Sequence, residues 1–304
     1  MLTYFLRRLL LTAAVLFATS IIAFLLVHLT ADPASTMAGE GASASDLEVI
    51  RKTYGFNRPL YVQYTAWLLD LLQGDFGRSY YLRRDVSEIL AERIPVTVTL
   101  GVSALCFSIV VSLTLGVCAA LRPNSMIDRF ALWLAVAGQA LPSFLVAIGL
   151  MYIFGVYLRL LPISGVSDWT GYILPVVALG YYSTPSLMRL TRAGMLEALQ
   201  SDHVRTARAY GLSPWRVTIR HALRHAILPV VSVAAVELGF MLGGSIIVES
   251  VFSLKGLGYL AWESIQRADI QVIQSILLLV AASYAVLTLC ADLLNAALDP
   301  RVRH

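Results

Sequence analysis

The sequence predicts an all-α, polytopic membrane protein that crosses the bilayer six times. Of its 304 residues, 58% are hydrophobic and only 14% are charged, and the mean hydropathy of +0.73 is too high for a soluble domain of this length. A helix needs about 20 residues to cross about 30 Å of hydrocarbon. Six apolar runs meet that length, at residues 9–30, 97–121, 130–157, 172–191, 228–248 and 273–294.

The first run predicts a retained transmembrane helix rather than a cleaved signal peptide. Arg7 and Arg8 precede an apolar stretch that is long enough to span a bilayer and lacks a small-x-small cleavage pattern near its end. Arginines that flank the later runs fall on the same side, which predicts that both termini are cytoplasmic. The flanking arginines are Arg7, Arg8, Arg122, Arg129, Arg301 and Arg303, together with those after Arg189.

Residues 31–96 separate the first two runs and predict an extracytoplasmic cap that is helical in parts. The basic residues of this segment are offset by nine acidic ones, and a segment of this length escapes the positive-inside rule. The chain shows no internal repeat and no low-complexity linker, so residues 1–304 are expected to form a single transmembrane domain. Besides the cap, this domain carries a cytoplasmic loop at residues 193–227.

Prolines and glycines inside the spans predict how the helices bend and pack. Pro142, Pro175 and Pro185 each remove a backbone donor, which is tolerated where neighbouring helices or a water-filled cavity satisfy the freed carbonyl groups. They predict kinked helices around a pathway. Gly239 and Gly243 form a GxxxG pattern, which we interpret as a site where a second helix packs closely.

Polar side chains within the spans are candidates for lining that pathway. Glu237 is the first candidate, because an acid near the middle of a bilayer is costly and usually faces a cavity or a partner. The sequence leaves open whether Glu237 lines the pathway or makes a buried polar contact. Gln139 and Ser143 are further candidates, although uncharged polar residues also hold helices together.

The basic segment from Asp202 to Pro229 predicts two helices that meet at a tight break and face a soluble partner. Gly211 is a helix stop, since glycine tolerates the left-handed conformation, and Ser213 with Pro214 supplies an N-cap and a favoured first residue. The second helix is expected to have an apolar and a basic face. The apolar face holds Trp215, Ile219, Ala222, Leu223, Ala226 and Ile227, and the basic face holds Arg216, Arg220 and Arg224. An amphipathic helix on anionic lipid is the alternative.

Several classes of chemistry find no support in the sequence. No G-x-x-x-x-G-K-[ST] motif for ATP hydrolysis and no G-x-S-x-G hydrolase motif occurs. His221 and His225 have the spacing of zinc ligands but lack the accompanying glutamate. The net charge of +4 does not fit a nucleic-acid binder. Cys106, Cys118 and Cys290 are expected to be buried packing residues, with no disulfide framework.

Short motifs recur along the chain in a specific order. They are Tyr4, Arg7 and Arg8 (YxxRR), residues 54–64 (YGFNRPLYVQY), 74–79 (GDFGRS), 93–97 (RIPVT), 243–249 (GGSIIVE), 256–258 (GLG) and 292–303 (DLLNAALDPRVR). With these motifs and the segment 202–229, which is similar to the cytoplasmic EAA loop, the chain resembles permease subunits of bacterial ABC importers over essentially its whole length. More narrowly, it resembles the first permease of dipeptide, oligopeptide, glutathione and nickel importers.

The resemblance implies a type I ABC importer permease fold and a pathway subunit rather than an enzyme. Its cytoplasmic helix would dock into a cleft of an ATP-hydrolysing subunit through Arg205, Thr206, Ala207, Arg208, Ala209, Tyr210 and Gly211. The implied partners are a second homologous permease, two ATPase subunits, an extracytoplasmic binding protein and the lipid of a bacterial inner membrane. ATP and magnesium would bind to the ATPases, and this chain would hold no cofactor. The binding protein would land on residues 31–96 and 251–269.

The sequence also departs from the family pattern. Arg205 stands where the EAA consensus has an acid, Thr206 replaces its first alanine, and Lys255 stands where this branch has a proline. For the substrate, di- and oligopeptides are preferred to nickel or a metal chelate, because Glu237 is the main acid expected along the path. A membrane enzyme or channel with a lipid-binding basic loop is the alternative from another class.

Overall fold

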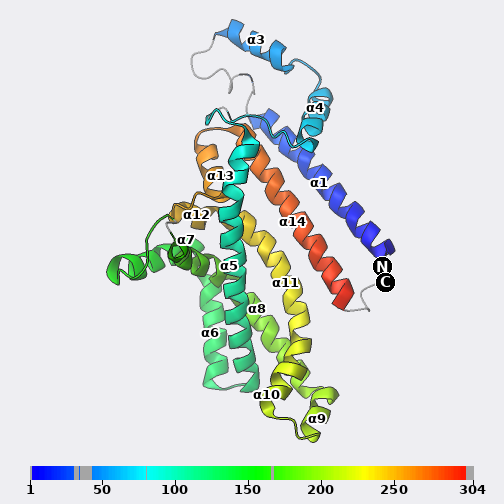
Figure 1. Cartoon of the computed structure of the whole chain (residues 1–304), viewed down its shortest axis with the longest axis vertical. Coiled ribbons are helices and arrows are strands. Elements are labelled where there is room, and N and C mark those ends of the chain that lie inside the picture. Colours follow the sequence, from blue (N-terminus) through cyan, green and yellow to red (C-terminus); the bar gives the residue numbers. More distant parts are fainter. Residues whose placement is uncertain (1, 31–33, 35–42, 80, 166–167, 299–304) are drawn as a thin grey trace.

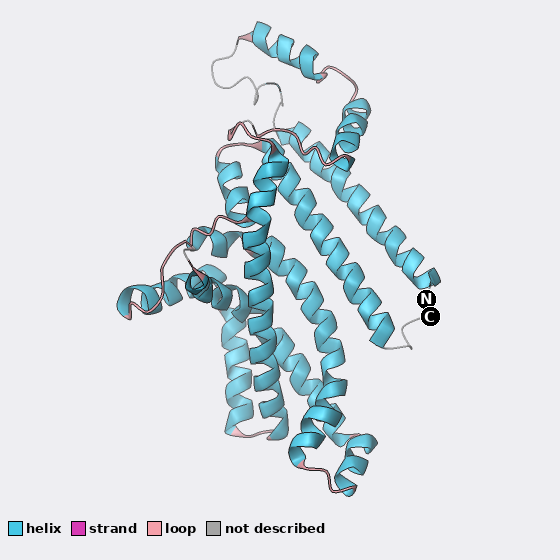
Figure 2. Ribbon diagram, in the orientation of Figure 1, coloured by secondary structure: helices cyan, strands magenta, loops and turns pink. Residues whose placement is uncertain are grey.

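The chain folds into long helices arranged along one axis (Figure 1), in a computed structural model that describes residues 2–30, 34, 43–79, 81–165 and 168–298. The described part consists of helices and loops (Figure 2). One isolated antiparallel bridge joins Arg78 to Asp85 within it. The elements are α1 (Leu2–Thr30), α3 (Ala44–Tyr54), α4 (Leu60–Leu72), α5 (Val86–Leu121), α6 (Met126–Ala140), α7 (Ser143–Leu150), α8 (Ile173–Gln200), α9 (Asp202–Ala209), α10 (Pro214–Arg216), α11 (Leu223–Gly244), α12 (Ile246–Val251), α13 (Leu257–Gln266) and α14 (Ile270–Leu298), with π-helical segments at Met151–Tyr157 and Val217–Ala222 and a short 3-10 helix at Trp169–Tyr172. The all-α prediction is confirmed.

A bundle of α5, α6, α8 and α11 fills the lower half of Figure 1. Helix α8 packs against the other three and therefore forms the centre of the bundle. Ser108 of α5 is fully buried there and donates a hydrogen bond to the carbonyl oxygen of Gly180 in α8, 2.5 Å away. Leu187 of α8 packs with Val230 and Ala234 of α11 in an apolar cluster. These contacts fix α8 between α5 and α11.

Helix α14 lies between α11 and α1, so that the first and last helices run side by side (Figure 1). Gly239 and Gly243 of α11 let α14 come close: a Cβ on Gly239 would lie 2.6 Å from Cδ2 of Tyr284. This confirms the packing interpretation of the GxxxG pattern. Arg8 of α1 and Asp292 of α14 form an ion pair of 2.7 Å. The start of α1 and the end of α14 are therefore neighbours.

The prediction of six spans is confirmed only in part. Four helices of the described chain are long and apolar enough to cross a bilayer, namely α1, α5, the helix from Pro214 to Gly243 and α14. The predicted span 130–157 is wrong as a single helix, because α6 and α7 meet at an angle of 105°. The predicted span 172–191 forms the start of α8, which is less apolar because a polar stretch runs from Tyr181 to Ser186.

Of the three prolines expected to kink helices, Pro142 is the one at which a helix ends. Leu141 before it has an extended backbone (φ −89°, ψ 131°), which is the conformation that proline imposes on its predecessor. Pro175 lies in the first turn of α8, where its missing donor is not needed, and α8 continues through Pro185. Of these three prolines, Pro142 therefore marks the sharp bend between α6 and α7.

The predicted cap region is helical in α3, α4 and the start of α5, as expected. It lies at the opposite end of the long axis from α9 and α10 (Figure 1), while residues 31–33, 35–42 and 80 are outside the described part. Helix α3 begins with a capping box: Asp46 N donates to Ser43 Oγ, and Ser43 N donates to the Asp46 carboxylate. Two flanking arginines used for orientation, Arg301 and Arg303, also lie outside the described residues.

The expectation for the cysteines is wrong. Cys106, Cys118 and Cys290 are free, but all three are exposed rather than buried. They lie on α5 and α14, two of the helices long enough to span a membrane. A side chain that is exposed on such a helix can face lipid tails instead of water. A thiol behaves there as a small, polarisable apolar group.

Candidate coupling surface and pathway cavity

Helix α9 is short and stops where the sequence predicts. Gly211 has φ +73°, a left-handed conformation that side-chain-bearing residues seldom adopt. Gly211 N donates to Arg208 O at 2.9 Å, and Leu212 N donates to Ala207 O at 3.3 Å. Together these bonds form a Schellman motif, which satisfies the last carbonyl groups of the helix. Ser213 and Pro214 then start α10 as predicted, although the Ser213 side chain makes no capping hydrogen bond.

The two faces of α9 have different roles. Val204 and Ala207 are buried, at 0% and 5% exposure, in an apolar cluster with residues of α8 and α11. The remaining predicted docking residues, Arg205, Thr206, Arg208, Ala209, Tyr210 and Gly211, are exposed. Tyr210 is 82% exposed. The docking role of Ala207 stays a prediction, but its side chain packs inward and holds the helix in place, because a residue three positions after Val204 shares its buried face.

The predicted apolar face of the following helix is corrected. Trp215 and Ile219 are exposed, at 73% and 38%, whereas Val217 and Thr218 are buried. The cause is the π-helical segment Val217–Ala222, whose wider turn rotates the side chains away from their positions in a regular α-helix. Ala222 and Ala226 are buried as expected. The basic residues Arg216, Arg220 and Arg224 are all exposed, so a basic face is present.

The two histidines with zinc-like spacing lie in consecutive segments, His221 in the π-helical segment and His225 in α11. His225 lies against His203 of α9, with ring centroids 4.5 Å apart. Within the described residues, no group of three or more His, Cys, Asp or Glu side chains is placed to hold a metal ion. The histidine contact joins the coupling helix to the start of α11.

A cavity of about 480 Å³ lies beside the bend between α6 and α7. The Tyr181 hydroxyl donates to the carbonyl oxygen of Leu141, 2.7 Å away, and so satisfies a backbone group at the bend. The walls come from the bend, α8, α11 and α12. Among the lining residues are the pathway candidates Gln139 and Ser143, together with Ser183, Tyr182 and Phe240. Residues far apart in the sequence thus meet at one hollow.

Glu237 reaches this cavity through a partner. Ser183, which lines the cavity, donates a hydrogen bond to Glu237 Oε2 at 2.6 Å. Gln139 accepts a hydrogen bond from Arg189 at 3.1 Å. The structure therefore brings Gln139 and Ser143 together at the cavity and places Glu237 one contact away from its wall. The sequence left open whether Glu237 lines the pathway or makes a polar contact. The structure shows a polar contact, which adjoins the cavity.

An ion pair ties the bent helices to α8 near the coupling end. Asp128, 2% exposed, receives two hydrogen bonds from Arg192, Nε at 2.6 Å and Nη2 at 2.7 Å. Asp128 also accepts from the backbone N of Asn124 at 2.9 Å, and its own N is capped by Ser125 Oγ at 3.4 Å. Such a two-pronged pair fixes both distance and orientation. It holds the first turn of α6 against α8.

Glu249 forms a buried junction that the sequence analysis missed. It is fully buried, and its carboxylate accepts hydrogen bonds from Thr97 at 2.7 Å, Ser245 at 2.8 Å and the backbone N of Tyr259 at 2.9 Å. Gly256 must be a glycine because a Cβ there would lie 2.5 Å from Glu249 Oε2. The motifs RIPVT, GGSIIVE and GLG therefore meet at one carboxylate, which we call the Glu249 junction.

The departure at Lys255 is accommodated in this turn. Its side chain is exposed, and its carbonyl oxygen accepts a hydrogen bond from Arg93 at 3.2 Å. Leu254 N donates to Glu249 O at 2.8 Å, which closes the turn without a proline. The shape of the turn is therefore set by Glu249 and Arg93.

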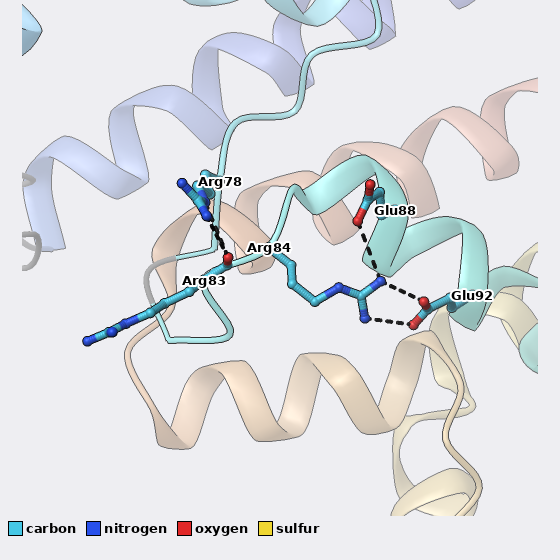
Figure 3. A network of polar contacts seen from close by, with 5 residues as sticks. All are labelled: Arg78, Arg83, Arg84, Glu88 and Glu92. Carbon is cyan, nitrogen blue, oxygen red and sulfur yellow. Dashed lines mark hydrogen bonds and ion pairs between the residues drawn. The ribbon is translucent and has the colours of Figure 1, made fainter.

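Next to this junction, the GDFGRS motif forms a turn that contacts the start of α14. Ser79 of the motif donates a hydrogen bond to the buried carboxylate of Asp269. Close to it, Arg84 pairs with Glu92 at 2.6 Å and with Glu88 at 3.5 Å, and the Arg83 side chain points away from this network (Figure 3). Hydrogen bonding to Glu92 raises the pKa of the Arg84 guanidinium above its ordinary value. The Arg84 network is exposed, so it shapes a surface more than it stabilises a core.

Only part of this pattern could be recognised in the sequence. The acid of GGSIIVE lies at the end of an apolar run, which is the same signal that singles out Glu237 and could have indicated a buried charge. Ser183 gave no signal, because a serine in a helix has many ordinary roles. Its importance comes from Glu237, 54 positions away in the chain.

Two family models match the chain. The model described as "Binding-protein-dependent transport system inner membrane component" matches residues 112–304, and its N-terminal counterpart matches residues 1–101. The chain is 38% identical to the glutathione transport system permease protein GsiC of Escherichia coli (strain K12) over 305 residues. It is 39% identical to that of Salmonella typhimurium. In both comparisons the match covers 100% of each chain.

Solved structures support the fold. The inward-facing MetNI methionine ABC transporter matches with a TM-score of 0.59 and 18% identity, over 69% of this chain and 96% of that chain. An amino acid ABC transporter, determined with histidines, matches with a TM-score of 0.51 and 19% identity, over 71% and 94%. At this identity the likeness concerns the fold alone.

These findings establish the class of protein. The chain is a permease subunit of an ABC importer, a transport subunit rather than an enzyme, and a multi-pass protein of a bacterial inner membrane. Such permeases work with other transporter subunits, including ATPases and a binding protein. By the match of its residues 112–304 and its full-length similarity to GsiC, the chain belongs to the family of binding-protein-dependent transport system inner membrane components.

Proposed function

We propose that this chain forms one half of the translocation pathway of an ATP-driven importer for di- and oligopeptides, including glutathione-like peptides. The support for the substrate class comes from relatives named as glutathione permeases, which match along the whole chain. The support for the pathway is the cavity at the bend between α6 and α7, which gathers Gln139, Ser143 and Ser183. In this proposal residues 1–304 act as one transmembrane domain with cytoplasmic termini and six crossings. The crossings are α1, α5, the bent pair of α6 and α7, α8, α11 and α14.

The single observation that carries the coupling part of the proposal is the exposed face of α9. Two buried residues, Val204 and Ala207, fix the helix, while Arg205, Arg208 and Tyr210 project outward. The segment from Asp202 to Arg224 contains five arginines and one aspartate. A rigid basic helix suits an acidic cleft on an ATP-hydrolysing subunit, since opposite potentials guide and orient docking.

The complete transporter in this proposal contains a second homologous permease and two ATPase subunits. ATP and magnesium bind to the ATPases, and this chain supplies no nucleotide site. The binding protein lands at the other end of the molecule, on the surface formed by the turn after α4, the start of α5 and residues 251–269. Arg83 and Arg84 lie on that surface (Figure 3).

The proposal is tested by ATP hydrolysis in lipid nanodiscs that hold this chain with its second permease and ATPases. We expect a binding protein loaded with trialanine to stimulate hydrolysis, and the Arg208→Glu variant to lose both the ATPase and the stimulation. A matched control is Arg129→Glu, the same charge reversal at an exposed position of α6, outside the basic segment. Stimulation by a nickel chelate in place of the peptide would contradict the substrate class. A wild-type chain that retains no ATPase would contradict the coupling role.

A further inference from the structure

Glu237 is an acid without a charge partner in the interior of the bundle. Its side chain is half-buried, and its hydrogen bond from Ser183 goes to Oε2. Within the described residues Oε1 accepts no hydrogen bond, and Glu237 forms no ion pair with any Lys, Arg or His. Oε1 is therefore accessible: it has no hydrogen-bond partner, and it is not one of the described buried atoms without a partner. One carboxylate oxygen is thus held and the other is accessible.

Glu237 does not line the cavity itself, but it shares a face of α11 with two residues that do. Phe240 and Met241 line the cavity, and they follow Glu237 by three and four residues, which places all three on one helix face. Ser183 is itself a lining residue and is 2% exposed. A buried hydroxyl that donates to Oε2 orients the carboxylate at the margin of the hollow.

Two aromatic rings line the same cavity as Ser183. Tyr182 of α8 and Phe240 of α11 are stacked, with ring centroids 6.1 Å apart and planes inclined by 17°, and both line the cavity. The face of an aromatic ring attracts an ammonium group, and the attraction grows where water is excluded. A carboxylate with adjacent aromatic faces is the chemistry that recognises a primary ammonium ion.

The opposite charge adjoins the same cavity through a lining residue. Arg189 donates to Gln139, a lining residue, and so stays on the α6 side of α8. Arg189 follows Ser183 by six residues, which separates them by about 9 Å along the helix axis. An extended tripeptide measures about 10 Å from end to end. The cavity of about 480 Å³ therefore adjoins a carboxylate through Ser183 and a guanidinium group through Gln139, and the spacing of Ser183 and Arg189 fits a short peptide.

We propose that this cavity is a cargo site within the permease, in which Glu237 binds the protonated amino terminus of a peptide. Ser183 positions the carboxylate, the Tyr182 and Phe240 rings flank the ammonium group, and the peptide carboxylate faces Arg189 and Gln139. The permease thereby adds a second selection step after the binding protein, in favour of peptides with a free amino terminus. This inference rests on the proposed peptide-import function.

The test measures direct binding to the complete transporter in nanodiscs without the binding protein, by saturation-transfer NMR. Trialanine is the probe, and N-acetyl-trialanine is the matched ligand without the ammonium charge. We expect Glu237→Gln to weaken trialanine binding at least about tenfold and to leave N-acetyl-trialanine binding unchanged, because a hydrogen-bonded charge is lost only with the first ligand. Ser183→Ala should weaken trialanine binding by a smaller factor.

Glu197→Gln is the control variant. It removes the same charge from α8, the helix of Ser183, but Glu197 is exposed and lies about 21 Å from Ser183 along the axis. It should bind trialanine like the wild type. Equal loss of both ligands in Glu237→Gln, or no loss of either, overturns the cargo role of Glu237, and so does absence of trialanine binding to the wild type. ATPase stimulation by the loaded binding protein is measured on the same samples, so a failed cargo site is distinguished from a failed importer.

Discussion

The Glu249 junction and the coupling helix α9 both contain motifs of the family, yet their physical situations are opposite. At the junction, a fully buried carboxylate is surrounded by donors from α5, α12 and the start of α13. On α9, the motif side chains other than Ala207 are exposed and, apart from a loose Asp202–Arg205 pair of 3.7 Å, have no ion-pair partner in the described chain. One motif therefore holds the fold together, while the other leaves its chemistry available to a partner.

This difference separates effects on stability from effects on assembly. Substitutions at the Glu249 junction should destabilise the chain itself, because buried donors lose their acceptor. Substitutions on the exposed face of α9 should leave the chain folded and remove an interaction with another subunit. Each variant below is therefore judged by two measurements, the thermal unfolding midpoint of the purified chain and the amount of ATPase that copurifies with it.

The largest effect is expected for Glu249→Ala. The change leaves the Thr97 and Ser245 hydroxyls and the Tyr259 N–H without an acceptor in a buried site and should cost about 4 kcal/mol. Thermal unfolding in detergent should therefore begin at a much lower temperature. Glu249→Gln, which keeps the shape and one acceptor oxygen, should lose less. An unchanged unfolding midpoint for Glu249→Ala would contradict a stabilising role of the Glu249 junction.

The next effect concerns the ion pair that joins α6 to α8. Asp128→Asn leaves Arg192 partly buried without its countercharge, and we expect a cost of about 3 kcal/mol. Arg192→Gln should cost a similar amount, and the double variant should cost less than the sum of the two, since both remove one interaction. Additive losses in this double-mutant cycle would show that the two residues act independently.

Gly256→Ala tests the packing of the junction with a single methyl group. The new Cβ would approach both Glu249 Oε2 and Thr97 Oγ1 to 2.5 Å, so the turn must shift, at a cost of about 2 kcal/mol. The unfolding midpoint again provides the measurement. Gly74→Ala is the control that adds the same methyl group without a steric clash, since no atom lies within 4 Å of a Cβ at that position. Its φ of +85° adds backbone strain.

Gly211→Ala tests the helix stop with a smaller effect. Nothing lies within 4 Å of a Cβ at this position, so the change adds only the strain of a left-handed alanine, about 1 kcal/mol. The coupling helix should fray at its end, and ATPase copurification should fall more than the unfolding midpoint does. A loss of stability as large as that of Gly256→Ala would mean that the stop supports the core.

Tyr210→Ala should have the smallest effect on stability and a strong effect on assembly. The side chain is 82% exposed, so the free energy of unfolding should change by no more than about 0.5 kcal/mol, as for other surface substitutions. The unfolding midpoint should therefore hardly move. ATPase copurification should drop sharply, since large exposed aromatic side chains often dominate binding at an interface. Full ATPase recovery would place the docking contact elsewhere on the basic segment.

The sequence predicted local features well and tertiary ones only in part. Gly211 and Pro142 act through the backbone of their own neighbours, so their stop and break could be predicted from residue type. The side on which Ala207 and Trp215 lie depends on the packing of α9 and on a π-helical turn, which periodicity does not reveal. The 105° bend that divides the apolar run 130–157 into two helices likewise depends on tertiary packing, although the proline at the break could be recognised.

The candidate site shows the same limit. Gln139 and Ser143 lie near each other in sequence on either side of the bend and share the cavity, which makes their joint role recognisable. The partnership of Glu237 with Ser183 joins two helices and could not be predicted without their arrangement. Burial of Glu249 likewise results from three segments that meet only in the folded chain.

The most direct test of this account is cysteine cross-linking to the ATPase subunit from two positions of α9. Cys106, Cys118 and Cys290 are first replaced by serine, and then either Tyr210→Cys or Val204→Cys is introduced into the complete transporter. We predict that position 210 cross-links to the ATPase and that position 204, which is fully buried, does not. Cross-linking from position 204 alone, or from neither position in an intact complex, would contradict the assignment of α9 as a fixed helix with an exposed docking face.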